Sequence, residues 1–378
     1  MGGAETWLMA LLRYTDRIKG DLPYKIKIDI CLTSGKKGVF DDEAASLGAN
    51  LFYPRYARGN LLNFINEFRS ILLCGDYDVI HDHQDYVAGI HFLIGIGLLP
   101  LVRISHIHNP LLHLESYSTS FSRKITASVG KYLLSKLATH ILGTSSQIIT
   151  EYGFDEDRFR NIMRRAVYCG FDVIRFKGNY KNYHHDLCEE FGWDDKVKII
   201  LFVGRLNSNL NQKNPGFALQ IFRDCIRLNP DTCFLMAGEG EDEKIKFDKI
   251  INMWGLEESI RVIGPRSDIP RLMLGSNLLL FPSVGEGLGM VAVEAQAAGL
   301  RVLASDAVPE ECEVVPGMVL FKSLEAKSSD WAADALSLLS LPRLGNFFCN
   351  HAVRSSPFSI ENSTSNLLNI YARLDTLD

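Results

Sequence analysis

The chain has 378 residues, more than one hydrophobic core usually serves, so we expect two domains. Apolar residues make up 47% and charged residues 22% of it, a composition that excludes an intrinsically disordered chain. The net charge is −5, with +1 over residues 1–172 and −6 over the remainder, so neither half is basic enough for nucleic acid to be the main partner.

The cysteines and the apolar runs predict a cytoplasmic protein. Eight cysteines are scattered without a CxxC pair or a Cys/His cluster, which favours reduced thiols and argues against a disulfide scaffold or structural zinc. The opening Met-Gly-Gly-Ala-Glu does not have the pattern of a signal peptide. The apolar stretch 86–102 carries His91 and is interrupted by Pro100, so we interpret it as a buried helix followed by a buried strand, not as a membrane span.

Helical patterns alternate with short β-rich runs along the whole chain, which is typical of parallel α/β architecture. In the first half, in chain order, we expect a helix over 5–13, a strand over 24–33, a helix over 61–73, a strand over 78–81, a helix over 86–98, a strand over 101–108, a helix over 121–137 and a strand over 139–143. In the second half we expect strands over 197–203, 233–237, 260–263, 278–281 and 302–304, with helices over 215–228, 242–254, 269–274, 289–298 and 331–339.

Two successive α/β series predict two facing Rossmann-like, doubly wound domains. Residues 1–172 form the first domain in this prediction and residues 196–358 the second. The polar stretch 173–195, with little strand pattern, is the predicted linker, and 359–378 is the predicted closing helix. Ligands of such sheets bind at the carboxyl ends of the strands.

The most informative segment is 278–299, where a buried strand, a glycine-rich turn and a helix follow one another directly. Such a turn brings backbone N–H groups close to a ligand, and the partial positive charge of the helix N-terminus suits a diphosphate. Glu286 lies in the turn. Glu294 lies on the helix, where its carboxylate can accept hydrogen bonds from two ribose hydroxyls. A capping glutamate and a solvated helix glutamate are the alternative, because a glycine turn before a helix is weak support by itself.

A cationic pair follows the first strand of the second half. That strand ends at Gly204-Arg205, and Lys213 comes shortly afterwards. At the carboxyl end of a parallel strand, these two cations can neutralise a diphosphate held by the Glu286 turn. As ordinary surface cations they would have no function, and their position at the ligand edge favours the binding role.

Several further segments fall into one order along nearly the whole chain. They are Gly2-Gly3-Ala4-Glu5, the run from Tyr77 to His83, His106-Ile107-His108-Asn109, Gly204-Arg205 with Lys213, Ala237-Gly238-Glu239-Gly240, the strand end with Gly264, and the E-x7-E pair Glu286 and Glu294. Together they resemble glycosyltransferase family four, a large family of retaining enzymes with the GT-B fold, and within it the EpsF-type exopolysaccharide glycosyltransferases.

The resemblance implies a transferase that takes its sugar from a nucleotide diphosphate sugar, with a UDP-sugar expected from the subgroup, and that needs no cofactor. Arg205 and Lys213 would bind the diphosphate, Glu294 the ribose, and His108 would lie near the reacting centre; His106 and a structural role for either histidine remain alternatives. The implied donor contacts are Gly2, Gly3, Gly204, Arg205, Lys213, Gly238, Gly264, Arg266, Glu286, Gly287, Leu288, Gly289 and Glu294, and the implied catalytic residues are His108, Glu286, Arg205 and Lys213.

The chain departs from the family pattern at three places. The loop 206–212 is longer than expected, and Cys169 stands where the family usually has asparagine. The family has a central strand just before the glycine loop, which here lies at the start of the chain. We therefore expect an apolar, β-rich segment to be encoded upstream of Met1.

The string Asp76-Tyr77-Asp78 matches the DxD motif that binds a divalent metal in the other large glycosyltransferase fold. Asp78 opens a predicted buried strand in the half that does not carry the donor motifs, so we interpret the match as accidental. No metal is predicted.

The acceptor is expected to be a glycan or a lipid-linked sugar. The basic helix 121–137 can lie on an anionic membrane surface, and a half-buried helix with solvated lysines is an equal alternative. Two other functions stay open. One is a non-catalytic nucleotide-sugar binding protein; the other is a nicotinamide-dependent dehydrogenase, for which the chain offers only fragments of GxGxxG.

Overall fold

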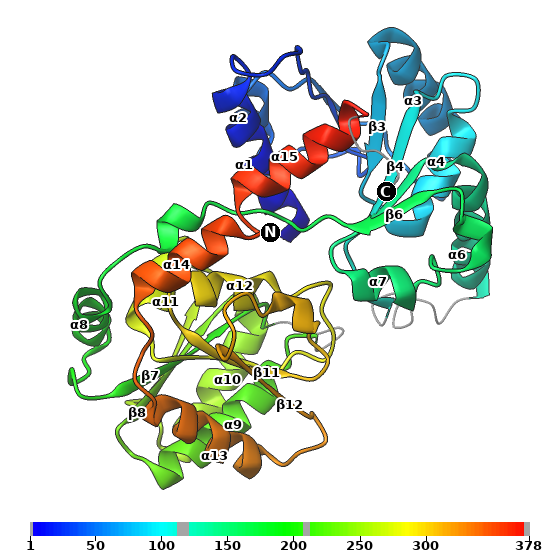
Figure 1. Cartoon of the computed structure of the whole chain (residues 1–378). Helices are drawn as coiled ribbons and strands as arrows, with labels where there is room; N and C mark the ends of the chain where they lie inside the picture. The colour runs from blue at the N-terminus through cyan, green and yellow to red at the C-terminus, as the bar shows by residue number, and fades with distance from the viewer. Residues whose placement is uncertain (1–2, 112–120, 207–211, 374–378) are drawn as a thin grey trace. The chain divides into compact units, whose positions relative to one another are not determined.

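The structure, a computed structural model, describes residues 3–111, 121–206 and 212–373 and divides into two compact units (Figure 1). Unit 1 comprises residues 1–171 and 360–378, and unit 2 comprises residues 172–359. Both units are built on parallel sheets with α-helices between the strands, so the predicted Rossmann-like α/β fold is confirmed.

Unit 2 contains a six-stranded parallel sheet with the order β12-β11-β10-β7-β8-β9. Its strands are β7 (Lys198–Val203), β8 (Thr232–Ala237), β9 (Ile260–Gly264), β10 (Leu278–Phe281), β11 (Arg301–Ser305) and β12 (Val319–Lys322). Its helices are η4 (Val173–Phe176), α8 (Tyr180–Phe191), α9 (Pro215–Leu228), α10 (Glu241–Trp254), α11 (Ile269–Gly275), α12 (Met290–Ala297), η5 (Glu310–Cys312), α13 (Ser328–Ser340) and α14 (Asn346–Ser355).

The core of unit 2 lies between its sheet and the helices α9, α10 and α13. Phe222 of α9 stacks on Phe234 of β8 with ring centroids 4.9 Å apart, and Trp331 of α13 is fully buried in the same cluster. The central strands β7, β8 and β10 read as continuous apolar runs because helices cover both faces of the sheet.

The boundary between the units differs from the prediction. Residues 173–195 hold η4 and α8 and form part of unit 2, so the expected linker is corrected to a chain crossing near Phe171 and Asp172. The helix α8 buries His184, Leu187 and Cys188, which explains why a stretch that reads as polar packs as a helix. The final helix, α15 (Ile360–Tyr371), returns to unit 1.

Unit 1 contains two separate parallel sheets, one with the order β3-β4-β5-β6 and one formed by β1 and β2. The predicted strand 24–33 pairs only over the two residues that face β2, and no strand in the described residues pairs with both β1 and β3. The strands are β1 (Ile30–Cys31), β2 (Leu51–Phe52), β3 (Val79–Asp82), β4 (Val102–Ile107), β5 (His140–Gly143) and β6 (Met163–Ala166).

The helices of unit 1 cover these sheets, and α15 packs against α1, where Trp7 Nε1 donates to Ser363 Oγ at 3.3 Å. The apolar stretch 86–102 is resolved into η2, α4 and β4, as expected, and among the described helices none is long and apolar enough to cross a membrane. The other helices described in unit 1 are α1 (Gly3–Ile18), α2 (Asp41–Ser46), η1 (Arg58–Asn60), α3 (Leu61–Gly75), η2 (Asp85–Val87), α4 (Ala88–Ile94), α6 (Phe121–Leu137), α7 (Ser146–Glu151) and η3 (Asp157–Phe159).

Candidate functional site

Three predicted glycines lie together at the carboxyl ends of β7, β8 and β9. The N–H of Gly204 donates to Ala237 at 3.0 Å, and the N–H of Gly238 donates to Gly264 at 2.8 Å. A Cβ on Gly238 would lie 1.7 Å from the carbonyl oxygen of Gly204, so only glycine fits there. The sheet edge is thus lined by backbone, and a ligand can approach it closely.

The turn after β10 leads into α12 through Gly289, whose φ of 89° is in the left-handed region. A Cβ on Gly289 would lie 2.9 Å from Val308 and 3.0 Å from Phe281, so both the backbone and the space require glycine. No side chain of the described residues caps α12. Its first N–H groups therefore remain available to an anion, in a turn where Gly287 and Leu288 are buried.

Lys213 and Glu286 form an ion pair beside this turn. Lys213 Nζ lies 2.6 Å from Glu286 Oε1, and the two side chains are 17% and 7% exposed. The N–H of Val284 donates to the carbonyl of Gln212 at 2.8 Å, which ties the segment before α9 to the turn after β10. The structure thus brings Lys213 to the Glu286 turn despite the long loop before it, most of which (207–211) lies outside the described residues.

Glu294 is half-buried in α12, and its carboxylate has no hydrogen bond or ion pair within the described residues. Burial raises the pKa of this carboxyl group to about 7, and the positive charges of Arg175 and Lys213 act in the opposite direction. Glu294 and Lys213 therefore lie within electrostatic reach of each other. A carboxylate that is partly desolvated but unpartnered is typical of a ligand site.

Arg205 and Arg175 are two further cations of unit 2. Arg205 is exposed and forms no ion pair in the part of the chain that the structure describes. Arg175 comes from η4, which the sequence analysis assigned to a linker, so its approach to Glu294 was missed. Only the fold of unit 2 brings this segment near α12, and no local pattern in the sequence indicates it.

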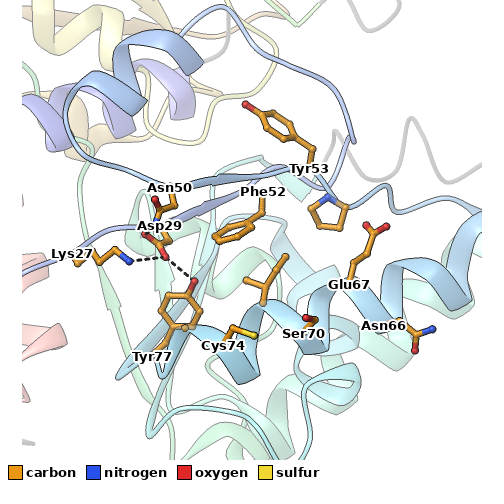
Figure 2. Close-up of a pocket in the computed structure, with 13 residues that line it drawn as sticks. Lys27, Asp29, Asn50, Phe52, Tyr53, Asn66, Glu67, Ser70, Cys74 and Tyr77 are labelled. Atoms are coloured by element: carbon orange, nitrogen blue, oxygen red, sulfur yellow. Dashed lines mark hydrogen bonds and ion pairs between the residues drawn. The ribbon is translucent and has the colours of Figure 1, made fainter.

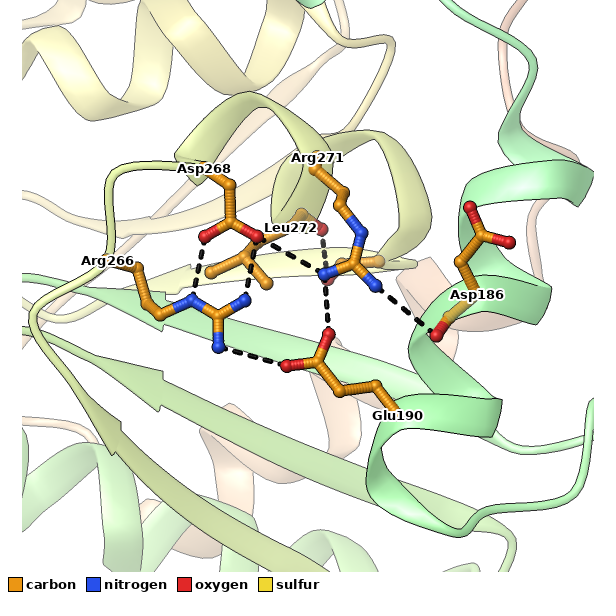
Figure 3. A network of polar contacts seen from close by, with 7 residues as sticks. Asp186, Glu190, Arg266, Asp268, Arg271 and Leu272 are labelled. Atoms are coloured by element: carbon orange, nitrogen blue, oxygen red, sulfur yellow. Dashed lines mark hydrogen bonds and ion pairs between the residues drawn. The ribbon is translucent and has the colours of Figure 1, made fainter.

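Arg266, predicted to flank a nucleotide base, is held in an ion-pair network between α8 and the start of α11 (Figure 3). Its guanidinium donates to both carboxylate oxygens of Asp268 at 2.7 Å and to Glu190 at 2.9 Å. Arg271 contacts the same two acids. The guanidinium is thus engaged within the protein, and its place beside a base remains a prediction.

Asp268→Asn is expected to lower the free energy of unfolding by about 1 kcal/mol at pH 7. The bidentate contact with Arg266 lowers the pKa of Asp268 to about 2, so the stabilisation is present above pH 3.8 and is lost as the pH falls toward 2. Urea unfolding at pH 7 and at successively lower pH measures the difference. A gap between the wild type and the variant that stays constant down to pH 3 would contradict the network as its source.

The predicted residues of unit 1 are placed less completely. Gly2 lies outside the described residues, and Gly3 opens α1. His108 Nε2 lies 2.9 Å from His83 Nδ1, and the His108 N–H donates to Asp85 at 3.0 Å. Asp85 has a left-handed φ of 50°, and burial raises its pKa to about 6. Sequence reasoning missed Asp85, which orients the turn that carries His108.

A separate pocket of about 720 Å³ lies in unit 1 between β2 and α3 (Figure 2). Its wall includes Tyr77, whose hydroxyl donates to Asp29 at 2.9 Å, and none of the predicted site residues line it. Asp76 caps α3 in the left-handed region. Asp76 and Tyr77 of the DxD string thus have local structural roles, and the interpretation of the match as accidental stays a prediction.

Comparison with known proteins gives consistent matches. Residues 197–340 match the family of glycosyl transferases group 1. The chain is 31% identical over 337 residues to the UDP-Gal:alpha-D-GlcNAc-diphosphoundecaprenol alpha-1,3-galactosyltransferase of Escherichia coli, which covers 82% of this chain and 81% of that protein. It is 26% identical over 386 residues to the glycosyltransferase EpsF of Bacillus subtilis (98% and 93% covered). The crystal structure of Anabaena HepE in complex with UDP is similar in fold, with a TM-score of 0.77, 17% identity, and 98% and 96% of the two chains covered.

Proposed function

Because the chain belongs to the family of glycosyl transferases group 1, we propose that it moves a hexose from a UDP-sugar onto a glycan or lipid-linked acceptor in polysaccharide biosynthesis. The name of the Escherichia coli relative specifies a UDP-sugar donor and a diphosphoundecaprenol-linked acceptor, and HepE was solved with UDP. We propose further that transfer retains the anomeric configuration, requires no metal ion or other cofactor, and takes place on the cytoplasmic side.

The donor site is proposed in unit 2. The single observation that carries this proposal is the unpartnered carboxylate of Glu294, within electrostatic reach of Lys213 and on the helix that Gly289 opens. The ribose would lie at Glu294, and the diphosphate between Lys213, Arg205 and the N-terminus of α12. In support, Arg205 lies just after the carboxyl end of β7, and Lys213 lies beside both Gly204 and Glu286.

The chemistry follows from the charge that develops as the anomeric C–O bond breaks. The leaving diphosphate gains negative charge, and the sugar gains positive charge. Lys213 is paired with Glu286 in the unliganded protein. When the diphosphate binds, we expect Lys213 to form an ion pair with the phosphate in place of Glu286. The Glu286 carboxylate can then accept hydrogen bonds from hydroxyl groups of the sugar. The acceptor hydroxyl then attacks from the leaving-group face, gives its proton to the departing diphosphate oxygen, and forms the new glycosidic bond, with no protein nucleophile.

The decisive experiment combines binding and turnover of the full chain. Calorimetric titration with UDP tests the site, and incubation with UDP-galactose and diphosphoundecaprenol-linked GlcNAc tests transfer, with the released UDP and the anomeric proton coupling of the product as readouts. UDP binding with a product of retained configuration supports the proposal. Binding without transfer from any of UDP-glucose, UDP-galactose and UDP-GlcNAc favours the non-catalytic alternative, and absence of UDP binding contradicts the site itself.

A membrane contact through α6 is proposed for the acceptor side. Ile125, Val129 and Tyr132 lie along one helix face and are 44% to 57% exposed, and Lys124 is exposed beside them. Such an apolar stripe with basic neighbours is typical of a helix that lies in the interface of an anionic membrane.

We expect the chain to float with vesicles that contain phosphatidylglycerol and not with phosphatidylcholine alone. The double substitution Ile125→Asp and Val129→Asp is expected to reduce the bound fraction at least tenfold, because two exposed apolar side chains that would enter the membrane interface are replaced by charges of the same sign as the lipid. Ile245→Asp, at an equally exposed isoleucine of α10, is the matched control. Equal flotation of all three proteins would exclude α6 as the contact.

A further inference from the structure

Two H-x-H segments of unit 1 lie on neighbouring parallel strands. Side chains two residues apart on a strand point to the same face, so His81 and His83 form one pair and His106 and His108 another. β3 and β4 are hydrogen-bonded neighbours in which Asp82 lies opposite Ser105, and His83 therefore follows opposite His106. The register thus gathers four imidazoles, called here the histidine array, on one face of one sheet.

The array is compact. The ring centroids of His81 and His83 are 4.1 Å apart, and those of His106 and His108 are 4.3 Å apart. Between the strands, His81 Nε2 lies 3.2 Å from His106 Nδ1, and His83 Nδ1 lies 2.9 Å from His108 Nε2. One ring nitrogen from each of His81, His83 and His106 lies within 4.8 Å of one from each of the other two.

His106 is the most buried member of the array. His106 is fully buried, and its Nε2 has no hydrogen-bond partner among the described residues. Trp7 covers the array from α1, with its ring centroid 5.3 Å from that of His106.

Neighbouring groups orient the rings without offering oxygen ligands. The Tyr371 hydroxyl lies 2.7 Å from His81 Nδ1, which leaves His81 Nε2 facing His106. A partner of this kind on the second ring nitrogen is usual for histidines that bind metals. The carboxylate of the intervening Asp82 is turned to His91, at 2.6 Å. The ligand set is therefore nitrogen alone, which suits Zn²⁺, Co²⁺ or Ni²⁺ and not Mg²⁺ or Ca²⁺.

We propose that His81, His83 and His106 form a binding site for a divalent transition-metal ion such as Zn²⁺, with one coordination position open. Tetrahedral zinc with Zn–N bonds of about 2.0–2.1 Å places its nitrogen ligands about 3.3 Å apart. Ring nitrogens that already lie within 4.8 Å reach this spacing by small side-chain rotations. The ion takes no part in the donor chemistry proposed for unit 2.

The first test uses the untagged full chain, because a polyhistidine tag binds the same ions. After treatment with a chelator, titration with Co²⁺ is expected to give one equivalent with the absorption spectrum of tetrahedral cobalt, which Zn²⁺ displaces and excess Mg²⁺ does not. X-ray absorption of the zinc-loaded wild-type chain is expected to show nitrogen ligands with imidazole scattering. Sulfur ligands would assign the metal to the cysteines and overturn the proposal, as would absence of stoichiometric binding.

Substitutions locate the site. His83→Gln and His106→Gln are each expected to weaken Co²⁺ binding at least tenfold, whereas His351→Gln, at an exposed histidine of α14, leaves it unchanged. His83 is less buried than His106, so its substitution disturbs the fold less. Circular dichroism establishes that each variant is folded. Unchanged binding in folded His83→Gln would overturn the proposal, and the X-ray absorption result decides the ligand type without any substitution. UDP binding in unit 2 is a separate property, so either result leaves the donor-site test independent.

Discussion

Lys213→Met is expected to lower the turnover of the nucleotide sugar about 100-fold to 1,000-fold, the loss typical when one preorganised donor to a developing charge is removed. Methionine keeps the aliphatic packing of this side chain against Gly204 but removes the charge, which lies 5.1 Å from the centroid of the Phe281 ring. Turnover falls because the leaving diphosphate then lacks a cation where its negative charge develops. The readout is UDP release at saturating donor.

The same substitution leaves Glu286 without its partner, so a structural effect must be separated from the catalytic one. An unpaired carboxylate that is 7% exposed destabilises the fold, whereas removal of both charges of a buried pair is often neutral. The double variant Lys213→Met with Glu286→Gln is therefore expected to regain thermal stability but not turnover. Lys181→Met, at an exposed lysine of α8, is the matched control. Recovery of turnover in the double variant would show that Lys213 serves the fold alone.

The sequence predicts the donor half of the molecule well because its elements are locally encoded. β10 is apolar throughout and β7 is apolar after Lys198, since helices cover both faces, and such runs are recognisable without tertiary information. Gly238 is required by a close backbone approach and directly follows the end of β8, and Gly289 is required by a left-handed φ and directly precedes α12. The family of glycosyl transferases group 1 is confirmed, and the retaining mechanism stays a prediction.

The features that sequence reasoning missed depend on contacts between distant segments. The strand expected over 24–33 pairs only at Ile30 and Cys31. A segment forms a strand only where a neighbouring strand pairs with it, and β2 contains two residues. Arg175 approaches Glu294 only because η4 joins unit 2. The histidine array depends on the alternation of side chains along β3 and β4 and on the register between the two strands. The sequence shows the H-x-H spacing but not the register.

Glu294→Gln is expected to stabilise the fold at high pH while it weakens UDP binding. The pKa of this carboxyl group is raised from 4.5 to about 7, so the folded state binds the proton more tightly than the unfolded state, and the free energy of unfolding of the wild type falls as the pH rises from 4.5 to 7. At pH 8 the ionised carboxylate costs about 1–3 kcal/mol, since one pKa unit corresponds to about 1.4 kcal/mol. Glutamine does not titrate and avoids this cost, so the variant should be the more stable protein at pH 8 and nearly equal to the wild type at pH 5.

The affinity for UDP is expected to fall in the same variant. The ionised carboxylate of Glu294 accepts hydrogen bonds from two ribose hydroxyls, and the amide oxygen of glutamine accepts them more weakly. Loss of hydrogen bonds to a charged group corresponds to about 1.5–3 kcal/mol, a 10-fold to 150-fold weaker affinity. Wild-type affinity for UDP should likewise rise as the pH passes through 7, and the variant should show no such rise. Urea unfolding at pH 5 and pH 8 and calorimetric titration with UDP measure both effects, with Glu257→Gln, at an exposed glutamate, as the control. A variant that gains no stability at pH 8 and keeps full affinity would show that Glu294 is an ordinary solvated helix residue, and the ribose site would have to lie elsewhere in unit 2.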